Sequence, residues 1–130
     1  MSKQTLQLHS TEFTIHSLDV DSPIPTELFK QTLFFIAKTY DELSIVCPSD
    51  FAINSLDAEH HWLALEVVGP LGFSLTGIMA NISGVLARAN ISIFAISTYD
   101  TDYVLVKKQA IKDAIKSLKK DGYTVIDDSL

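Results

Sequence analysis

The sequence has little that could form a covalent or metal-bound framework. Its 130 residues include one cysteine, Cys47, which excludes an intramolecular disulfide and a cysteine-based zinc site. Cys47 ends the apolar run LSIVC, so we expect a buried small hydrophobic side chain rather than a nucleophile. His60 and His61 are adjacent, and successive strand residues point to opposite faces of a sheet. The sequence therefore predicts no metal site.

Positive charge and long apolar runs are also scarce. Ten Lys and Arg residues stand against 16 Asp and Glu residues, which gives a net charge of -6. Nucleic acids and anionic membranes require a basic face, so we expect neither as a partner. No apolar run reaches the length of a membrane span, and the first residues, MSKQTLQLHSTEF, lack the apolar segment of a signal peptide. These absences predict a cytoplasmic protein.

Glycine is infrequent, with five residues, and two of them suggest a nucleotide site that the neighbouring residues exclude. Gly72 to Gly77 reads G-x-x-x-x-G, the glycine frame of a phosphate-binding loop. That motif needs Lys and then Ser or Thr after the second glycine, and Ile78 and Met79 stand there instead. We interpret the frame as a turn that presents backbone donors, with Gly77 on the helix surface one turn past a cap at Ser74.

The C-terminal half has a regular pattern of strands and helices. Hydrophobic residues make up 47% of the chain, which is enough for a packed core. WLALEVV at 62–68 is typical of a buried strand, and apolar residues at three- and four-residue steps predict a helix from Ser74 to Asn90. Asn90 is placed to end that helix in a left-handed cap.

The same half continues with two strands at 91–98 and 103–108, a second amphipathic helix that stops near Gly122, and a last strand at 123–127. Lysines of the 107–120 segment lie opposite its apolar stripe and are expected to form a solvated helix face. The order βαββαβ predicts an α+β, ferredoxin-like fold with an antiparallel sheet and helices on one face.

The N-terminal half contains a shortened copy of this plan. With an offset of 59 residues, FIAKTYDELSIV at 35–46 aligns with FAISTYDTDYVL at 94–105, including the shared Thr-Tyr-Asp. Pro23 and Pro25 leave room only for a turn through Glu27 to Lys30. Ser49 or Asp50 is placed to cap a short helix through Leu56. We predict two domains, an abbreviated one at 1–60 and a complete one at 61–130.

Several of these residues carry a resemblance to a known family. The glycine-containing turn at 69–74, Trp62, TYDELS at 39–44 and STYDTDY at 97–103 resemble the ACT domain family. Within it, the chain is similar to small tandem-ACT proteins related to aspartokinase regulatory domains and to the CASTOR arginine sensors. The resemblance spans the chain from Phe13 onward. It implies two ACT subdomains in tandem and regulatory binding of a small molecule, usually an amino acid.

The resemblance also implies where a ligand would lie. An amino acid would bind between the turn after the first strand of the complete domain and a neighbouring strand and hairpin, at an interface between ACT units, with no cofactor. Backbone donors before a helix suit its carboxylate, and either strand carbonyls or the hairpin carboxylates suit its ammonium group. The implied ligand-binding residues are Gly69, Pro70, Leu71, Gly72, Phe73 and Ser74 on the turn, and Phe94, Ile96, Thr98, Asp100 and Asp102 across the interface.

The expected function is a non-catalytic sensor that acts as a homodimer. One alternative is a structural dimerisation module without a ligand, and Asp100 and Asp102 would then be ordinary turn residues. A second is a small acylphosphatase-like hydrolase, which needs a cation in the loop after the first strand. The only arginine, Arg88, lies instead near the end of the first long helix. The serines also lack a nearby His-Asp pattern, so we predict no catalytic residue.

Overall fold

The computed structural model describes residues 3–69 and 77–127, which divide into two compact units. Unit 1 combines Met1–Ser10 with Leu63–Leu130, and unit 2 is Thr11–Trp62. Two long strands, β1 (Thr5–Leu18) and β4 (Asp57–Gly69), contribute residues to both units. No helix in the described ranges is long and apolar enough to cross a membrane.

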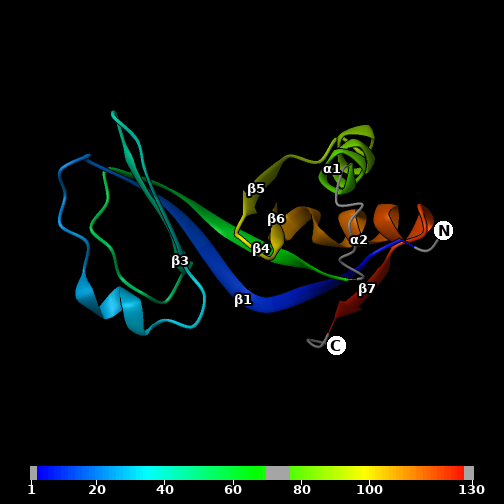
Figure 1. Ribbon diagram of the computed structural model, residues 1–130, viewed down its shortest axis with the longest axis horizontal. Helices are drawn as coiled ribbons and strands as arrows, with labels where there is room; N and C mark the ends of the chain where they lie inside the picture. The colour runs from blue at the N-terminus through cyan, green and yellow to red at the C-terminus, as the bar shows by residue number, and fades with distance from the viewer. Residues whose placement is uncertain (1–2, 70–76, 128–130) are drawn as a thin grey trace. The chain divides into compact units, whose positions relative to one another are not determined.

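Unit 1 is built on a sheet of the order β7-β1-β4-β6-β5 with two α-helices (Figure 1). Its remaining elements are α1 (Ile78–Arg88), β5 (Ile93–Ser97), β6 (Asp102–Lys107), η2 (Lys108–Ala110), α2 (Ile111–Lys120) and β7 (Thr124–Asp127). The expected α+β class with a βαββαβ order is confirmed. One difference is that β7 pairs in parallel with Thr5–Leu8 of β1. The start of β1 therefore lies between β4 and β7, the first and last strands of the βαββαβ order.

One face of the unit 1 sheet carries both helices and the main core. Leu63, Leu65 and Val67 alternate along β4 and pack with Val104 and Val106 of β6 against the helices. The helices contribute the buried side chains of Ile78, Ile82, Val85, Leu86, Ile111, Ala114 and Leu118. Lys112, Lys116, Lys119 and Lys120 of α2 are exposed, so the prediction of a solvated lysine face is confirmed. The period-two and helical apolar patterns thus converge on one buried layer.

The two ends of α1 differ in how well the sequence predicts them. Asn90 adopts a φ of 65°, the left-handed conformation expected after the last helical residue, and the Asn90 N–H bonds the Ala87 carbonyl at 2.9 Å. At the other end, Gly77 is the N-cap residue, with a φ of 89°. The interpretation of Gly77 as a helix-surface residue past the cap is therefore wrong. Ser74, the predicted cap, lies outside the described residues.

Unit 2 confirms the sequence duplication at the level of strand register. It contains η1 (Thr26–Lys30), β2 (Phe35–Lys38) and β3 (Leu43–Pro48) beside parts of β1 and β4. Phe35 pairs with Val46 across β2 and β3, and Phe94 pairs with Leu105 across β5 and β6. Both pairs differ by the 59 residues that separate the sequence copies. The two turns also share a hydrogen bond. The Thr39 N–H donates to the Glu42 carbonyl at 2.9 Å, and the Thr98 N–H donates to the Thr101 carbonyl at 2.8 Å.

The segment after β3 corrects one expectation. The predicted turn at 27–30 is the 3-10 helix η1, but no helix follows Ser49 in the described residues of unit 2. Two backbone bonds tie the segment to β1 instead, from the Ser49 N–H to the Glu12 carbonyl and from the Leu56 N–H to the Ser17 carbonyl, both 2.8 Å. The Ser49 hydroxyl bonds the Thr14 hydroxyl rather than capping a helix. A turn at 49–50 and an irregular segment after it therefore take the place of the predicted helix.

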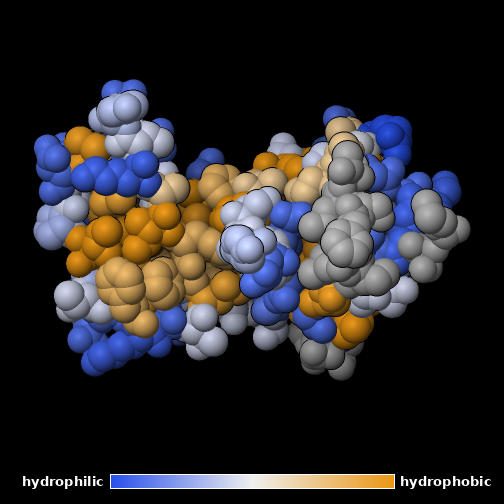
Figure 2. All heavy atoms as spheres, viewed as in Figure 1, coloured by the Kyte–Doolittle hydropathy of each residue, from blue (hydrophilic) through white to orange (hydrophobic). Residues whose placement is uncertain are grey.

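The core of unit 2 is small and leaves apolar side chains at the surface. Leu18, Leu28, Leu43, Ile45 and Cys47 form its buried cluster. Cys47 is fully buried, as expected, and burial, with a smaller contribution from the Asp50 charge, raises the pKa of its thiol to about 11. Phe29 remains 60% exposed, with its ring edge-on to Phe34, and apolar atoms reach the surface of this unit (Figure 2).

A buried histidine in unit 2 predicts a pH dependence of stability. His16 is 6% exposed, its Nδ1 lies 2.9 Å from the Ser55 hydroxyl, and its Nε2 has no hydrogen-bond partner among the described residues. Burial first, and the nearby His60 second, lower the pKa of His16 below its ordinary value of 6.5. Between this lowered pKa and 6.5, the unfolded chain binds more protons at His16 than the folded chain does. The stability contributed by neutral His16 therefore declines as the pH falls below 6.5.

We expect the midpoint temperature of unfolding to decrease when the pH is lowered from about 7.5 to about 5.5. His16→Gln should reduce this decrease, because glutamine does not titrate. Thermal unfolding followed by circular dichroism at both pH values would measure the change. His61→Gln is the control, because His61 is an exposed histidine of the same unit. An equal reduction by His61→Gln would contradict the assignment to His16.

Candidate functional site

The turn of the β5–β6 hairpin and the first residue of β6 hold three of the residues implied to bind a ligand, Thr98, Asp100 and Asp102. Thr98 closes the turn, because its hydroxyl donates to the Thr101 carbonyl and accepts from the Thr101 N–H, both at 3.1 Å. Asp102 opens β6, and the Ser97 hydroxyl donates to its carboxylate at 2.5 Å. Asp100 lies exposed in the turn. The hairpin thus presents two carboxylates on a backbone that its own hydrogen bonds hold in place.

The end of β4 lies at the same end of the unit 1 sheet as the start of β6. His9 of β1 connects them, because its Nε2 lies 2.9 Å from a Glu66 carboxylate oxygen and its ring centroid lies 6.4 Å from that of Tyr103. Glu66 is three residues before Gly69, and Tyr103 directly follows Asp102. The topology therefore places Gly69, the last residue of β4, at the same end of the sheet as the start of β6 at Asp102.

Sequence reasoning did not single out the group formed by His9, Glu66 and Tyr103. Burial first, and the Glu66 charge second, raise the pKa of the Tyr103 hydroxyl, so it remains protonated at neutral pH. The available signal was Glu66 itself, because it is the one charged residue within the apolar run WLALEVV. An ionisable residue inside a buried strand normally needs a partner, and here His9 supplies it.

The described candidate residues divide between the two faces of the sheet. Phe94 pairs with Leu105 and Ile96 with Tyr103, so these four side chains share one face. Asp102 alternates with Tyr103 and shares the other face with Val104 and Val106, which contact the helices. Phe94 and Ile96 therefore do not lie on the same face as the Asp102 carboxylate.

The turn implied to bind the ligand carboxylate is only partly described. Gly69 is the last residue of β4, and Gly77 begins the described chain again as the N-cap of α1. Pro70, Leu71, Gly72, Phe73 and Ser74 lie outside the described residues. The first N–H groups of α1 have no carbonyl partner within the helix, and the positive end of the helix dipole lies there. This end of unit 1 therefore suits a carboxylate.

Two other kinds of site, an anion-binding arginine for hydrolysis and a metal centre, can be compared with the described residues. Arg88 is in the last turn of α1, away from the loop that follows the first strand of the βαββαβ unit. Within residues 3–69 and 77–127, no group of three or more His, Cys, Asp or Glu side chains is arranged to hold a metal ion.

Comparison with known families divides the chain in a similar way to its two units. The ACT domain model matches residues 57–120, and a second family model, that of an N-terminal domain, matches residues 11–55. The human cytosolic arginine sensor for mTORC1 subunit 1 is 40% identical over 74 residues, which are 56% of this chain and 22% of that protein. The chain thus spans about a fifth of the length of the arginine sensors it matches.

Solved structures agree on the fold. Protein Atu0741 from Agrobacterium tumefaciens superposes with a TM-score of 0.90 at 26% identity, over 98% of this chain and 96% of that one. The regulatory subunit of aspartate kinase from Thermus thermophilus superposes with a TM-score of 0.64 at 13% identity, over 92% of this chain and 98% of that one, and shows a shared fold. With the family match and the βαββαβ order of unit 1, residues 57–120 belong to the ACT domain family.

Proposed function

We propose that the chain is a non-catalytic regulatory module that binds an amino acid at an interface between ACT domains. The observation that carries this proposal is the ACT match over residues 57–120, because that range includes both the segment after Gly69 and the β5–β6 hairpin. The similarity to a protein named as a cytosolic arginine sensor supports the ligand class and a cytoplasmic location.

The chemistry of a free amino acid fits the two parts of this site. Its carboxylate binds backbone N–H groups between Gly69 and the start of α1, where the helix dipole is favourable. Its ammonium group binds the carboxylates of Asp100 and Asp102. Two carboxylates also favour a ligand whose side chain is positively charged.

Phe94 and Ile96 have a different part in this proposal from the one the sequence suggested. They lie on the face of the sheet opposite Asp102, so one domain cannot direct them and Asp102 at the same ligand. We infer that they contact a second copy of the chain. β5 is the end strand of the sheet that the described residues form, and a partner domain beside it would extend that sheet.

A thermal-shift panel of the twenty amino acids at about 1 mM tests the proposal, since a ligand that binds only the folded state raises the midpoint. For an amino acid that shifts the midpoint, calorimetry should show binding about tenfold weaker in Asp102→Asn, because a charged hydrogen-bond acceptor contributes about 1.5 kcal/mol. Asp113→Asn, an exposed position on α2, is the matched control and should bind normally. Sedimentation velocity would measure the expected dimer.

Two other functions predict different experimental results. A structural dimerisation module would dimerise, yet no amino acid would shift its midpoint, which would contradict the sensor proposal. An acylphosphatase-like hydrolase would turn over acyl phosphate and lose that activity in Arg88→Ala. The position of Arg88 in the last turn of α1 favours the non-catalytic function.

A further inference from the structure

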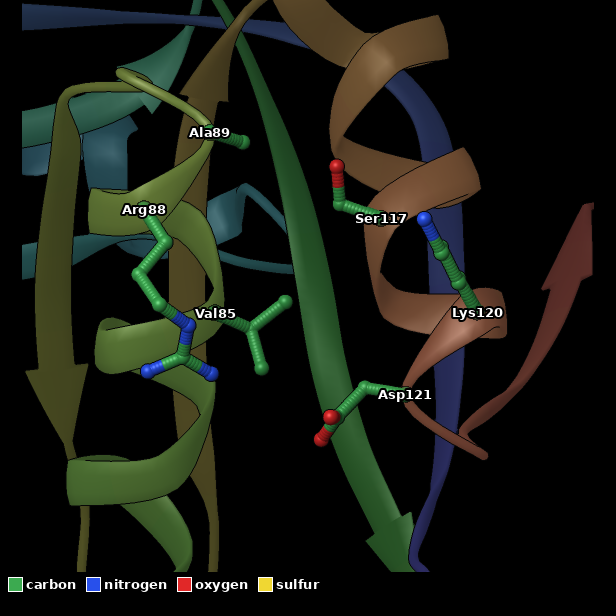
Figure 3. A pocket seen from close by; sticks show the side chains of 6 residues that line it. All are labelled: Val85, Arg88, Ala89, Ser117, Lys120 and Asp121. Atoms are coloured by element: carbon green, nitrogen blue, oxygen red, sulfur yellow. The ribbon is translucent and has the colours of Figure 1, made fainter.

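A cavity of about 410 Å³ lies between α1 and α2 of unit 1. Val85, Arg88 and Ala89 line it from α1 and its C-terminal end, and Ser117, Lys120 and Asp121 line it from α2 and its C-terminal end (Figure 3). The volume falls in the range of small-molecule sites, roughly 300–1,000 Å³. None of these six residues belongs to the proposed amino-acid site at the β5–β6 hairpin.

The charges at this cavity are unevenly distributed. Arg88 and Lys120 are its two cations, one from each helix, and Asp121 is its only carboxylate. The Lys3 ammonium lies 2.8 Å from that carboxylate, and the Asn81 amide donates to the same oxygen at 3.1 Å. Both hydrogen bonds lower the pKa of Asp121, and the bond from Lys3 has the larger effect. The carboxylate is therefore ionised and already neutralised by a lysine.

Arg88 and Lys120 consequently remain as the uncompensated charges of the cavity. Three cations, Lys3 included, against one carboxylate leave two positive charges. The C-terminal ends of α1 and α2 each add the equivalent of about half a negative charge, which reduces this excess without reversing its sign. The whole chain has a net charge of -6, so this is a local concentration of positive charge on an acidic protein.

Gly84 leaves room for the Arg88 guanidinium. A Cβ atom at Gly84 would lie 3.3 Å from Arg88 Nη1, so the guanidinium rests over the helix one turn before its own Cα. A glycine inside a helix costs roughly 0.5–1 kcal/mol relative to alanine, and here it provides the space for that side chain. The planar fork of arginine matches carboxylate and phosphate oxygens in pairs, and the Ser117 hydroxyl adds a donor from the opposite wall.

We propose that this cavity binds a small organic dianion, either a phosphate ester or a dicarboxylate. Arg88 and Lys120 bind its oxygens from opposite helices, and the apolar atoms of Val85 and Ala89 contact its carbon skeleton. An inorganic ion alone would contact only part of this lining. The ligand has the opposite charge preference to the one proposed at the hairpin, so the chain would have a second, independent ligand site on the helices.

Calorimetry on the full chain in a buffer of low ionic strength tests this proposal with succinate, glycerol 3-phosphate and inorganic phosphate. We expect saturable binding of succinate or glycerol 3-phosphate, weakened at least tenfold in the double variant Arg88→Gln, Lys120→Gln. Lys112→Gln, Lys116→Gln is the matched control, because it removes the same charge from exposed positions that do not line the cavity. It should bind as the natural chain does.

Three results would overturn the proposal. They are the absence of saturable binding of both organic anions, an equal loss in the two double variants, and binding of inorganic phosphate as tight as that of the organic anions. Asp102→Asn separates the two sites, since it should weaken the amino acid and leave the organic anion unaffected. Amide shifts of Gly84 and Ser117 on titration would locate the anion even if Arg88→Gln, Lys120→Gln lowered the stability.

Discussion

Leu118→Ala should lower the free energy of unfolding by about 2–5 kcal/mol, a large part of the 5–15 kcal/mol typical of a whole domain. Leu118 is fully buried in the core of unit 1, on the face of α2 that packs with Ile82 and Leu86 of α1 and with Val104 of β6. Truncation removes three carbon atoms from contact and leaves a cavity between the helices and the sheet. Denaturant unfolding followed by circular dichroism would measure the change.

Leu56→Ala is the matched control for this prediction. It makes the same chemical change at a leucine that is 77% exposed, and surface substitutions usually change stability by less than about 0.5 kcal/mol. A comparable loss in both variants would contradict the account of the core. Leu118→Met conserves volume and should cost less than about 1.5 kcal/mol, so it separates lost packing from a general intolerance of substitution.

Much of unit 1 could be predicted because its signals are local. Asn90 follows the last apolar residue of the first helical pattern, and its left-handed conformation matches the expectation. The β5–β6 hairpin could be predicted from its β-branched residues and from the Thr-Tyr-Asp that it shares with the β2–β3 hairpin. The structure adds that the two hairpins have the same register, which two aligned sequence segments suggest but do not require.

The remaining features depend on contacts between residues that are distant in the sequence. No local pattern predicts that Thr5–Leu8 lie between β7 and β4, because strand order follows from pairing across more than a hundred residues. The segment after Ser49 has the cap of a helix but bonds β1 instead. In the candidate site, Glu66 was visible in the sequence, whereas its partner His9 is 57 residues away.

The division of the candidate residues between two faces of the sheet also depends on strand register, which the sequence alone does not determine. A shift of one residue would move Asp102 to the face of Phe94. The pairing of Ser97 with Asp102 fixes the register, and the Ser97 hydroxyl bond to the carboxylate reinforces it.

The two glycines of α1 should respond in opposite directions to the same substitution. Gly77 has a φ of 89° and nothing within 4 Å of an added Cβ, so Gly77→Ala introduces backbone strain without a clash. A non-glycine residue in this conformation costs roughly 1–2 kcal/mol, and we expect that loss of stability. Gly84 lies inside the helix, where alanine is favoured by roughly 0.5–1 kcal/mol, and the end of the flexible Arg88 side chain can move aside.

We therefore expect the two variants to differ by about 2 kcal/mol in the free energy of unfolding, with Gly77→Ala below the natural chain and Gly84→Ala at or above it. Denaturant unfolding of both variants beside the natural chain would measure this difference. Gly77→Asn provides a further check, because asparagine tolerates the left-handed conformation better than alanine and should recover part of the loss. If Gly77→Ala were as stable as the natural chain, the left-handed cap at the start of α1 would be contradicted.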